Sequence, residues 1–137
     1  MAKTCNQKMP FLYCPARLNT LLPTGLPPHT LVLKQGIPIM LLRNLNPYRG
    51  LCNGTRLIVM HVLQGGRVLQ AKIIGGLYLD NIIPRIALQP KDGEFPFEWR
   101  RRQFPVRVCF AMSIDKSQGQ TLDRAGIYLA EDVFAHG

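Results

Sequence analysis

The chain has 137 residues, of which 47% are hydrophobic, enough for the core of one small domain. Its formal net charge of +9 favours polyanionic partners such as nucleic acid. No apolar run approaches the roughly 18 to 20 residues that span a bilayer, and the amino terminus lacks the apolar stretch of a secretory signal. We therefore expect no membrane partner and an intracellular location, nuclear or cytoplasmic; a mitochondrial location is less favoured, because the acid-free amino terminus is poor in serine and arginine.

The predicted elements begin after residues 1–15, which match no motif and are predicted as a leader of unknown structure. Several prolines limit any helix to a short turn over 16–22. Runs of Val, Ile and Leu predict strands over 31–33, 37–43, 55–63, 67–74, 81–88, 106–113 and 126–129. Residues 57–63 and 67–73, joined through Gly65 and Gly66, form the clearest hairpin. Short strands with glycine turns predict a mainly β (β-rich α+β) chain, built as a small barrel or sandwich.

Charge is unevenly distributed along the chain. Residues 1–79 hold nine Lys or Arg and no Asp or Glu, whereas residues 80–137 hold eight basic and eight acidic side chains. Such a region attracts phosphate backbones with an affinity that falls steeply with salt. Arg43, Arg49 and Arg56 are therefore candidate nucleic-acid contacts. The alternative is a charge excess that only keeps the chain soluble.

A second basic cluster follows the only tryptophan, Trp99. It comprises residues 100–102 and Arg107. An indole beside guanidinium groups suits stacking with the bases of a single strand. Because Phe95 and Phe97 flank Trp99, a core position is the alternative, and the residues alone favour it.

Cysteine and histidine spacing predicts no metal site and no catalytic group. The cysteines at 5, 14, 52 and 109 form no C-x-x-C pair and have no histidines at ligand spacing. Free thiols are the default, and Cys109 is expected to be a small buried hydrophobe. No nucleophilic triad is supported by spacing. We expect no cofactor and no metal.

Residues 108–122, VCFAMSIDKSQGQTL, join an apolar strand to a polar helix start. Asp115 and Gln118 have the spacing of a capping box. The hydroxyl groups of Ser113 and Ser117, the ammonium group of Lys116 and the amide of Gln118 are then expected to converge on an anion. The alternative is an ordinary strand-turn-helix with a solvated lysine, because no single residue is diagnostic.

The same stretch resembles the late motif of superfamily-one DNA helicases of the Pif (petite integration frequency) family. The version in Helitron transposons, close to A-M-T-I-N-K-S-Q-G-Q-T-L, is especially similar. Residues 16–59 are similar to the family's stretch leading into a small SH3-like insertion, with the runs GLPPH at 25–29, RN at 43–44 and CNGT at 52–55. With the tail after residue 125, the resemblance runs in order over roughly residues 16–137.

The resemblance implies an SH3-like small barrel attached to a partial RecA-like sheet. The barrel would occupy about residues 36–104 of a single domain over 16–137, and the partial second RecA-like domain about 16–35 and 105–137. Asp115 departs from the family, which commonly has His or Asn there. Its carboxylate would repel phosphate unless Lys116 or Arg124 compensates it, or unless it only caps the helix.

Carried over residue by residue, the resemblance implies that residues 113–119, the late motif, contact the DNA strand. Ser113, Lys116, Ser117 and Gln118 would contact the strand through side chains, and Gly119 through its backbone. The phosphate-loop pattern G-x-x-x-x-G-K-[ST] does not occur in the sequence, and the sequence ends where related helicases continue into the helix of their arginine finger. We therefore expect a truncated, non-catalytic module without ATPase or unwinding activity.

Two function classes remain open. The first is a helicase-derived module that binds single-stranded DNA or other nucleic acid through its basic surface and the 113–119 motif. The second is a transposon-derived protein-interaction module with no nucleic-acid role. Its partner is not identified by the sequence, and exposed strand edges or apolar surface would also permit homo-oligomers.

Overall fold

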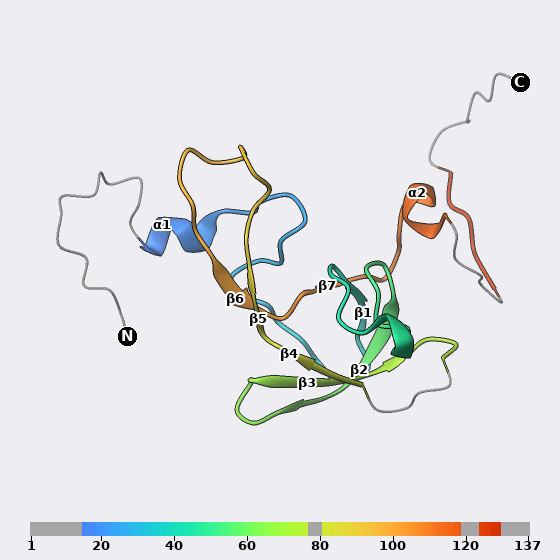
Figure 1. Ribbon diagram of the computed structural model, residues 1–137. Helices are drawn as coiled ribbons and strands as arrows, with labels where there is room; N and C mark the ends of the chain where they lie inside the picture. Colours follow the sequence, from blue (N-terminus) through green and yellow to red (C-terminus); the bar gives the residue numbers. More distant parts are fainter. Residues whose placement is uncertain (1–14, 77–80, 119–123, 130–137) are drawn as a thin grey trace, which may run out of the picture.

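A computed structural model describes residues 15–76, 81–118 and 124–129 of the chain. Within these ranges the protein is mainly β, as predicted, and its elements follow one another as shown in Figure 1. The elements are α1 (Pro15–Thr20), β1 (Pro38–Leu41), the 3-10 helix η2 (Pro47–Arg49), β2 (Arg56–Leu63), β3 (Val68–Ile73), β4 (Asn81–Pro84), β5 (Ile86–Leu88), β6 (Arg101–Gln103), β7 (Val106–Val108) and α2 (Ile114–Ser117).

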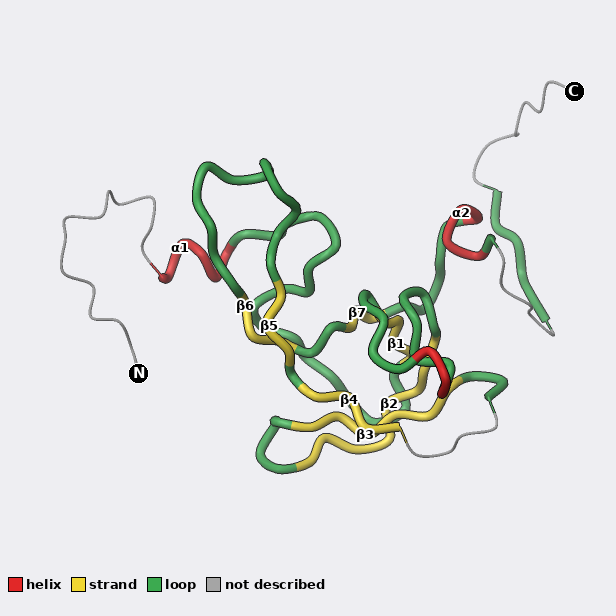
Figure 2. The backbone as a smooth tube through the Cα atoms, in the orientation of Figure 1, coloured by secondary structure: helices red, strands yellow, loops and turns green. Residues whose placement is uncertain are grey.

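The main sheet has five antiparallel strands in the order β4-β3-β2-β1-β7. Its first four strands are consecutive along the chain, and β7 returns to pair with β1. Strands β5 and β6 form a separate two-stranded sheet, which Figure 2 shows away from the main sheet, with the loop 89–100 at its far end. The return of β7 onto β1 ties a late part of the sequence to an early one.

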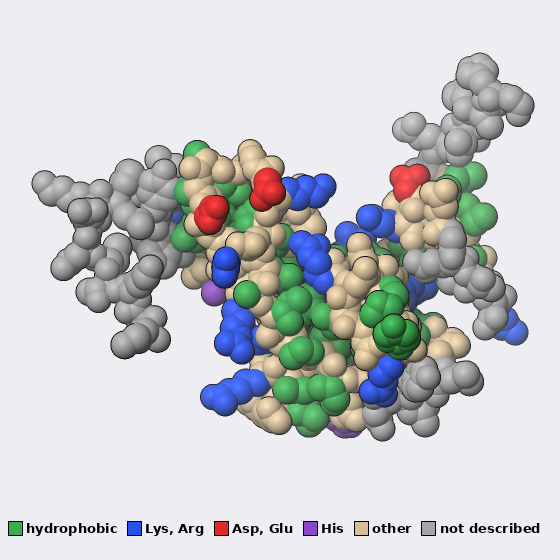
Figure 3. All heavy atoms as spheres, viewed as in Figure 1, with side chains coloured by type: hydrophobic (Ala, Val, Ile, Leu, Met, Phe, Trp, Pro, Cys, Tyr) green, Lys and Arg blue, Asp and Glu red, His purple; other side chains and the backbone are tan. Residues whose placement is uncertain are grey.

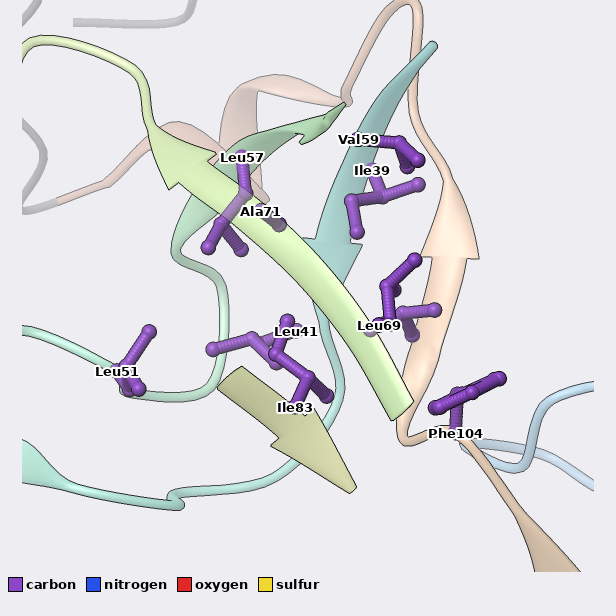
Figure 4. Close-up of a cluster of buried hydrophobic side chains, with 10 residues drawn as sticks. Ile39, Leu41, Leu51, Leu57, Val59, Leu69, Ala71, Ile83 and Phe104 are labelled. Atoms are coloured by element: carbon purple, nitrogen blue, oxygen red, sulfur yellow. The ribbon is translucent and has the colours of Figure 1, made fainter. Parts of the chain in front are cut away.

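The core lies on one face of the main sheet. Residues alternate between buried and less buried over 56–60 of β2 and 68–72 of β3, because successive side chains of a strand point to opposite faces. Val59 of β2 pairs with Ala71 of β3, and both lie in one buried cluster with Leu57 and Leu69, drawn in Figure 4. The remaining buried members come from β1, β4, β7 and two loops: Ile39, Leu41, Leu51, Ile83, Phe104 and Val106.

The predicted hairpin is confirmed by the pairing of β2 with β3. Leu63 and Val68 face each other at its end. The connecting turn contains three consecutive residues with positive φ, which are Gln64, Gly65 and Gly66. The two glycines adopt this conformation without steric cost.

Some predicted strands differ from the observed ones. The range 81–88 divides into β4 and β5, which belong to different sheets, and the range 106–113 shortens to β7. Residues 31–33 and 126–129 form no strand, although Leu31 and Leu33 pack against the core. These differences arise because a strand needs a neighbouring strand to pair with, and apolar composition does not supply one.

Candidate nucleic-acid interface

Acidic side chains of the described residues are confined to two places. Asp92, Glu94 and Glu98 lie on the loop between β5 and β6, and Asp115 lies on α2. Figure 3 shows the Asp and Glu side chains in the upper part of the view, while Lys and Arg side chains are scattered over the visible face among hydrophobic and other groups. The main sheet therefore presents basic groups without acidic neighbours on its own strands.

Two arginines flank Met40 across three strands of the main sheet. Met40 of β1 pairs with Arg56 of β2 on one side and with Arg107 of β7 on the other. Directly opposite residues of antiparallel strands share a face, and this face is opposite to the one that carries Ile39 and Leu41. With strands about 4.8 Å apart, the two arginine Cα atoms lie about 10 Å from each other.

Arg56 and Arg107 differ in exposure. Arg107 is exposed, whereas Arg56 is half-buried and its Nε makes no hydrogen bond within the described part of the chain. A buried guanidinium nitrogen without an acceptor is costly. Because this nitrogen is buried and Met40 between the two arginines is 2% exposed, Arg107 is the more accessible cation of the pair. We call Arg56, Met40 and Arg107 the arginine row.

The loop around η2, which carries Arg49, is joined by a hydrogen bond to the residue before Arg56. The Thr55 hydroxyl donates to the Gly50 carbonyl at 2.7 Å, so these two residues are in direct contact. Arg49 precedes Gly50 and Arg56 follows Thr55 in the sequence. Arg49 is exposed at the end of η2.

The third predicted basic residue, Arg43, is engaged by the fold. Its Nη1 donates to the Leu42 carbonyl at 2.8 Å and to the Gly25 carbonyl at 3.4 Å. Arg43 is half-buried, and these bonds connect the end of β1 to the turn at residues 23–26. The structure thus gives Arg43 a structural role beside the one expected from the sequence.

The late motif is a single helical turn that stands apart from the arginine row. Ser113 is the N-cap of α2 but makes no capping bond, and Gln118 is the C-cap. The predicted capping box is therefore wrong, because Asp115 lies inside the helix and not before it. The Ser117 hydroxyl donates to the Ile114 carbonyl at 2.7 Å.

Lys116 and Gln118 are exposed on this turn, and Gly119 lies outside the described residues. Helix α2 packs against none of the other described helices and strands, and Figure 1 shows it away from the main sheet. The structure therefore does not bring the motif donors together with Arg49 and Arg56.

Trp99 packs against its aromatic neighbours but does not belong to the core cluster. It is half-buried and its ring meets that of Phe95 edge-on at 5.8 Å. The Arg101 guanidinium covers it, with its central carbon 4.9 Å from the ring centroid. One face of Trp99 is thus unavailable to a base.

Arg101 itself serves the fold. It is only 5% exposed and donates to the carbonyls of Leu18, Leu21 and Pro27 at 2.8, 3.0 and 2.9 Å. Burial lowers the pKa of Arg101 below its ordinary value, since desolvation disfavours the charged form. Its three acceptors hold residues 18–27 against β6.

The described residues offer no other obvious chemical site. No group of three or more metal-ligating side chains occurs among them. Cys52 and Cys109 carry free thiols, and the buried Cys109 donates to the Ala111 carbonyl. A hollow of about 550 Å³ lies within the loop 89–99, and it is lined by none of the predicted site residues. No described helix is long and apolar enough to cross a membrane.

Sequence reasoning omitted Arg107 from the interface. It had grouped this residue with the cluster after Trp99, because the sequence does not reveal which strand lies beside β7. The only available signal was alternation, since Val106 is buried and its neighbour must point outward. The register of β7 with β1 then shows that Arg107 lies opposite Met40.

Comparison with known proteins identifies the class of this module. A family model described as "DNA helicase Pif1, 2B domain" matches residues 17–62. The ATP-dependent DNA helicase PIF1 of Homo sapiens is 40% identical over 108 residues, which cover 78% of this chain and 16% of the relative. The PIF1 helicase of Rattus norvegicus is 38% identical over the same shares of each chain.

Two solved structures are also similar. Unliganded Pif1 from Bacteroides sp. is 25% identical, with a TM-score of 0.46, over 67% of this chain and 29% of that one. Bacteroides Pif1 bound to single-stranded DNA is 25% identical, with a TM-score of 0.44, over 67% and 22%. The matched region is that of a helicase 2B domain. The chain is thus similar to part of the DNA helicases of the Pif family, and it spans 16% of the length of the curated relatives cited above.

Proposed function

We propose that this chain is a non-catalytic module of Pif-helicase origin that binds single-stranded DNA or other nucleic acid. The arginine row carries the proposal, because it places two basic side chains on one face of a sheet whose strands bear no described acidic residue. The curated relatives are named as ATP-dependent DNA helicases, which supports nucleic acid as the class of partner. Electrostatic contacts of this kind are largely independent of sequence.

We assign the main contacts to Arg49, Arg56 and Arg107. Arg43 is a secondary candidate because its guanidinium already has backbone acceptors. Residues 113–119, with Ser113, Lys116, Ser117, Gln118 and Gly119, form a second contact region. A nucleic-acid strand that contacts both regions has to run from the sheet face to α2. We therefore expect the two regions to contribute separately to the binding affinity.

We further propose that the main sheet is an SH3-like barrel of the Helitron type of this family. Its four consecutive strands and the return of β7 onto β1 support this assignment. Because β7 completes the sheet, we place the end of the barrel near Cys109 and not at residue 104. The part of the chain after the barrel is then the partial RecA-like region, whereas residues 17–35, expected in that region from the sequence, fall within the range that the 2B-domain model matches.

The non-catalytic part of the proposal rests on the printed sequence. No phosphate loop of the pattern G-x-x-x-x-G-K-[ST] occurs in the 137 residues. Backbone N–H groups and the lysine of such a loop are what hold the nucleotide phosphates in these enzymes. We propose an intracellular location, because that is where a nucleic-acid partner is found.

A second candidate function is protein interaction, including self-association. The observation that favours it is a set of apolar side chains that follow β7 without cover. Phe110, Ile114 and Ile127 are 72%, 70% and 78% exposed, and a protein partner or a second copy of the chain could cover them. The protein-interaction function does not depend on the basic face of the sheet.

The experiment that separates the two is a titration of a fluorescently labelled single-stranded oligonucleotide, followed by anisotropy at low and at physiological salt. We expect binding that weakens steeply with salt and varies little with sequence. Absence of binding even at low salt would refute the nucleic-acid function. Sedimentation of the free chain and a pull-down from cell extract, run in parallel, measure self-association and protein capture.

A further inference from the structure

We propose that Tyr48 is a base-stacking residue, which makes the η2 loop a site for an unpaired nucleobase. The inference rests on the proposed nucleic-acid function and deepens it, because it adds a contact to the base beside the contacts to phosphate. It also restricts the ligand to single strands or unpaired regions, whose bases are free to stack.

Tyr48 has no role in the core. Its side chain is 94% exposed, the highest value among the large hydrophobic residues described. The two leucines that flank the loop behave differently, since Leu51 is 4% exposed and Leu45 packs against the core cluster. The loop is therefore anchored at both ends while its aromatic ring stands in solvent, and Figure 3 shows hydrophobic side chains protruding over η2.

Backbone hydrogen bonds fix the loop that carries this ring. Asn46 and Leu51 form an antiparallel bridge, and the Leu51 N–H donates to the Asn46 carbonyl at 2.9 Å. The Asn46 side chain caps η2 by accepting from the Arg49 N–H, and Pro47 starts the helix. Gly50 ends it in the left-handed conformation, at φ 73°. An exposed ring on a fixed loop loses little conformational freedom on binding.

The surroundings of Tyr48 suit a nucleotide. Arg49, the next residue in the sequence, is an exposed cation on the same loop. No Asp or Glu occurs anywhere in residues 1–79. A base on the ring would thus leave its own phosphates beside cations, which is the pattern of stacking platforms that bind single strands.

The test compares Tyr48→Ala with the unchanged chain on two probes, a labelled oligothymidine and an abasic strand of the same length. We expect Tyr48→Ala to weaken oligothymidine binding by about five-fold or more, the lower end of measured stacking contributions. Binding to the abasic strand should not change, because that strand has no base to stack. Tyr48→Phe should keep full affinity, since the ring is retained.

Tyr128→Ala is the matched control, because Tyr128 is another exposed tyrosine, at 89%, outside the η2 loop. We expect it to leave both affinities unchanged. Equal affinity of Tyr48→Ala and the unchanged chain for oligothymidine would overturn the stacking role while the proposed function stands. Equal losses on the two probes, or the same loss in Tyr128→Ala, would also overturn it. If the unchanged chain binds neither probe, the proposed function itself fails, and the stacking role with it.

Discussion

The guanidinium group of Arg101 lies over the Trp99 ring, with its central carbon 4.9 Å from the ring centroid, and its nitrogens donate to three backbone carbonyls. The pair joins the loop 89–100 to residues 18–27, far earlier in the chain. A cluster that suggested nucleic-acid binding in the sequence is thus partly a structural support. The basic surface available to a ligand is therefore smaller than the net charge suggests.

Replacement of Arg101 should weaken this support. In Arg101→Met, the three carbonyls lose their donor. Each buried carbonyl left unpaired lowers the free energy of unfolding by about 1 to 3 kcal/mol. We expect a lower midpoint of urea unfolding, followed by the fluorescence of Trp99. Arg102→Met is the control, because Arg102 is exposed in the same strand and should change stability by no more than about 0.5 kcal/mol. Equal midpoints for the two variants would contradict the structural role of Arg101.

The core face of β2 gives a second prediction. Val59 is 0% exposed, whereas its neighbour Ile58 is only half-buried. Val59→Asp places an unpaired carboxylate in the core at a cost of several kcal/mol, comparable to the total stability of a small domain, about 5 to 15 kcal/mol. We expect loss of the cooperative thermal transition in Val59→Asp and its retention in Ile58→Asp. The reverse order would mean that the register of β2 is wrong.

Local patterns in the sequence predicted part of this fold, because some elements depend mainly on nearby residues. The alternation in 57–63 and 67–73 and the glycines between them were enough for the β2–β3 hairpin. Strand β6 was missed because Arg101, Arg102 and Gln103 have little strand preference. Two of them are buried through hydrogen-bond partners that lie 74 to 83 residues earlier in the chain.

The candidate site also has residues that the sequence predicted and a residue whose place depends on long-range pairing. Basic composition and the resemblance indicated Arg49 and Arg56, but the place of Arg107 depended on the pairing of β7 with β1. Residues 126–129 looked like a strand, yet they form none, since no neighbouring strand pairs with them. Long-range pairing has no signature in a single sequence, so its consequences could not be predicted.

The left-handed conformation of Gly50 leads to a third prediction. In Gly50→Ala, an L-residue at φ 73° is strained, at a cost of roughly 1 to 2 kcal/mol, although a new Cβ would only touch the Ile73 side chain at 3.6 Å. We expect the melting temperature to fall by several degrees. Gly126→Ala serves as the control, because this glycine has open space around it and no positive φ. Unchanged melting of Gly50→Ala would show that the η2 loop is not held as described.

ATP hydrolysis provides a fourth prediction. The purified chain should release no phosphate from ATP above background, with or without single-stranded DNA, because its sequence contains no phosphate loop. Phosphate release is measured before and after a second purification step, which removes contaminating enzymes. DNA-stimulated turnover that persists after this step and disappears in Lys116→Ala would show that the chain is catalytic.

The arginine row is tested most directly by the salt dependence of oligonucleotide binding in Arg56→Gln/Arg107→Gln. If both arginines touch phosphate, the slope of log K against log salt should flatten by about 1.4, at roughly 0.7 per contact for a single strand. The control Lys34→Gln/Arg67→Gln removes the same charge at exposed positions outside the row and should leave the slope nearly unchanged. The same slope for both double variants, whether flattened or not, would contradict the assignment of the interface to the arginine row.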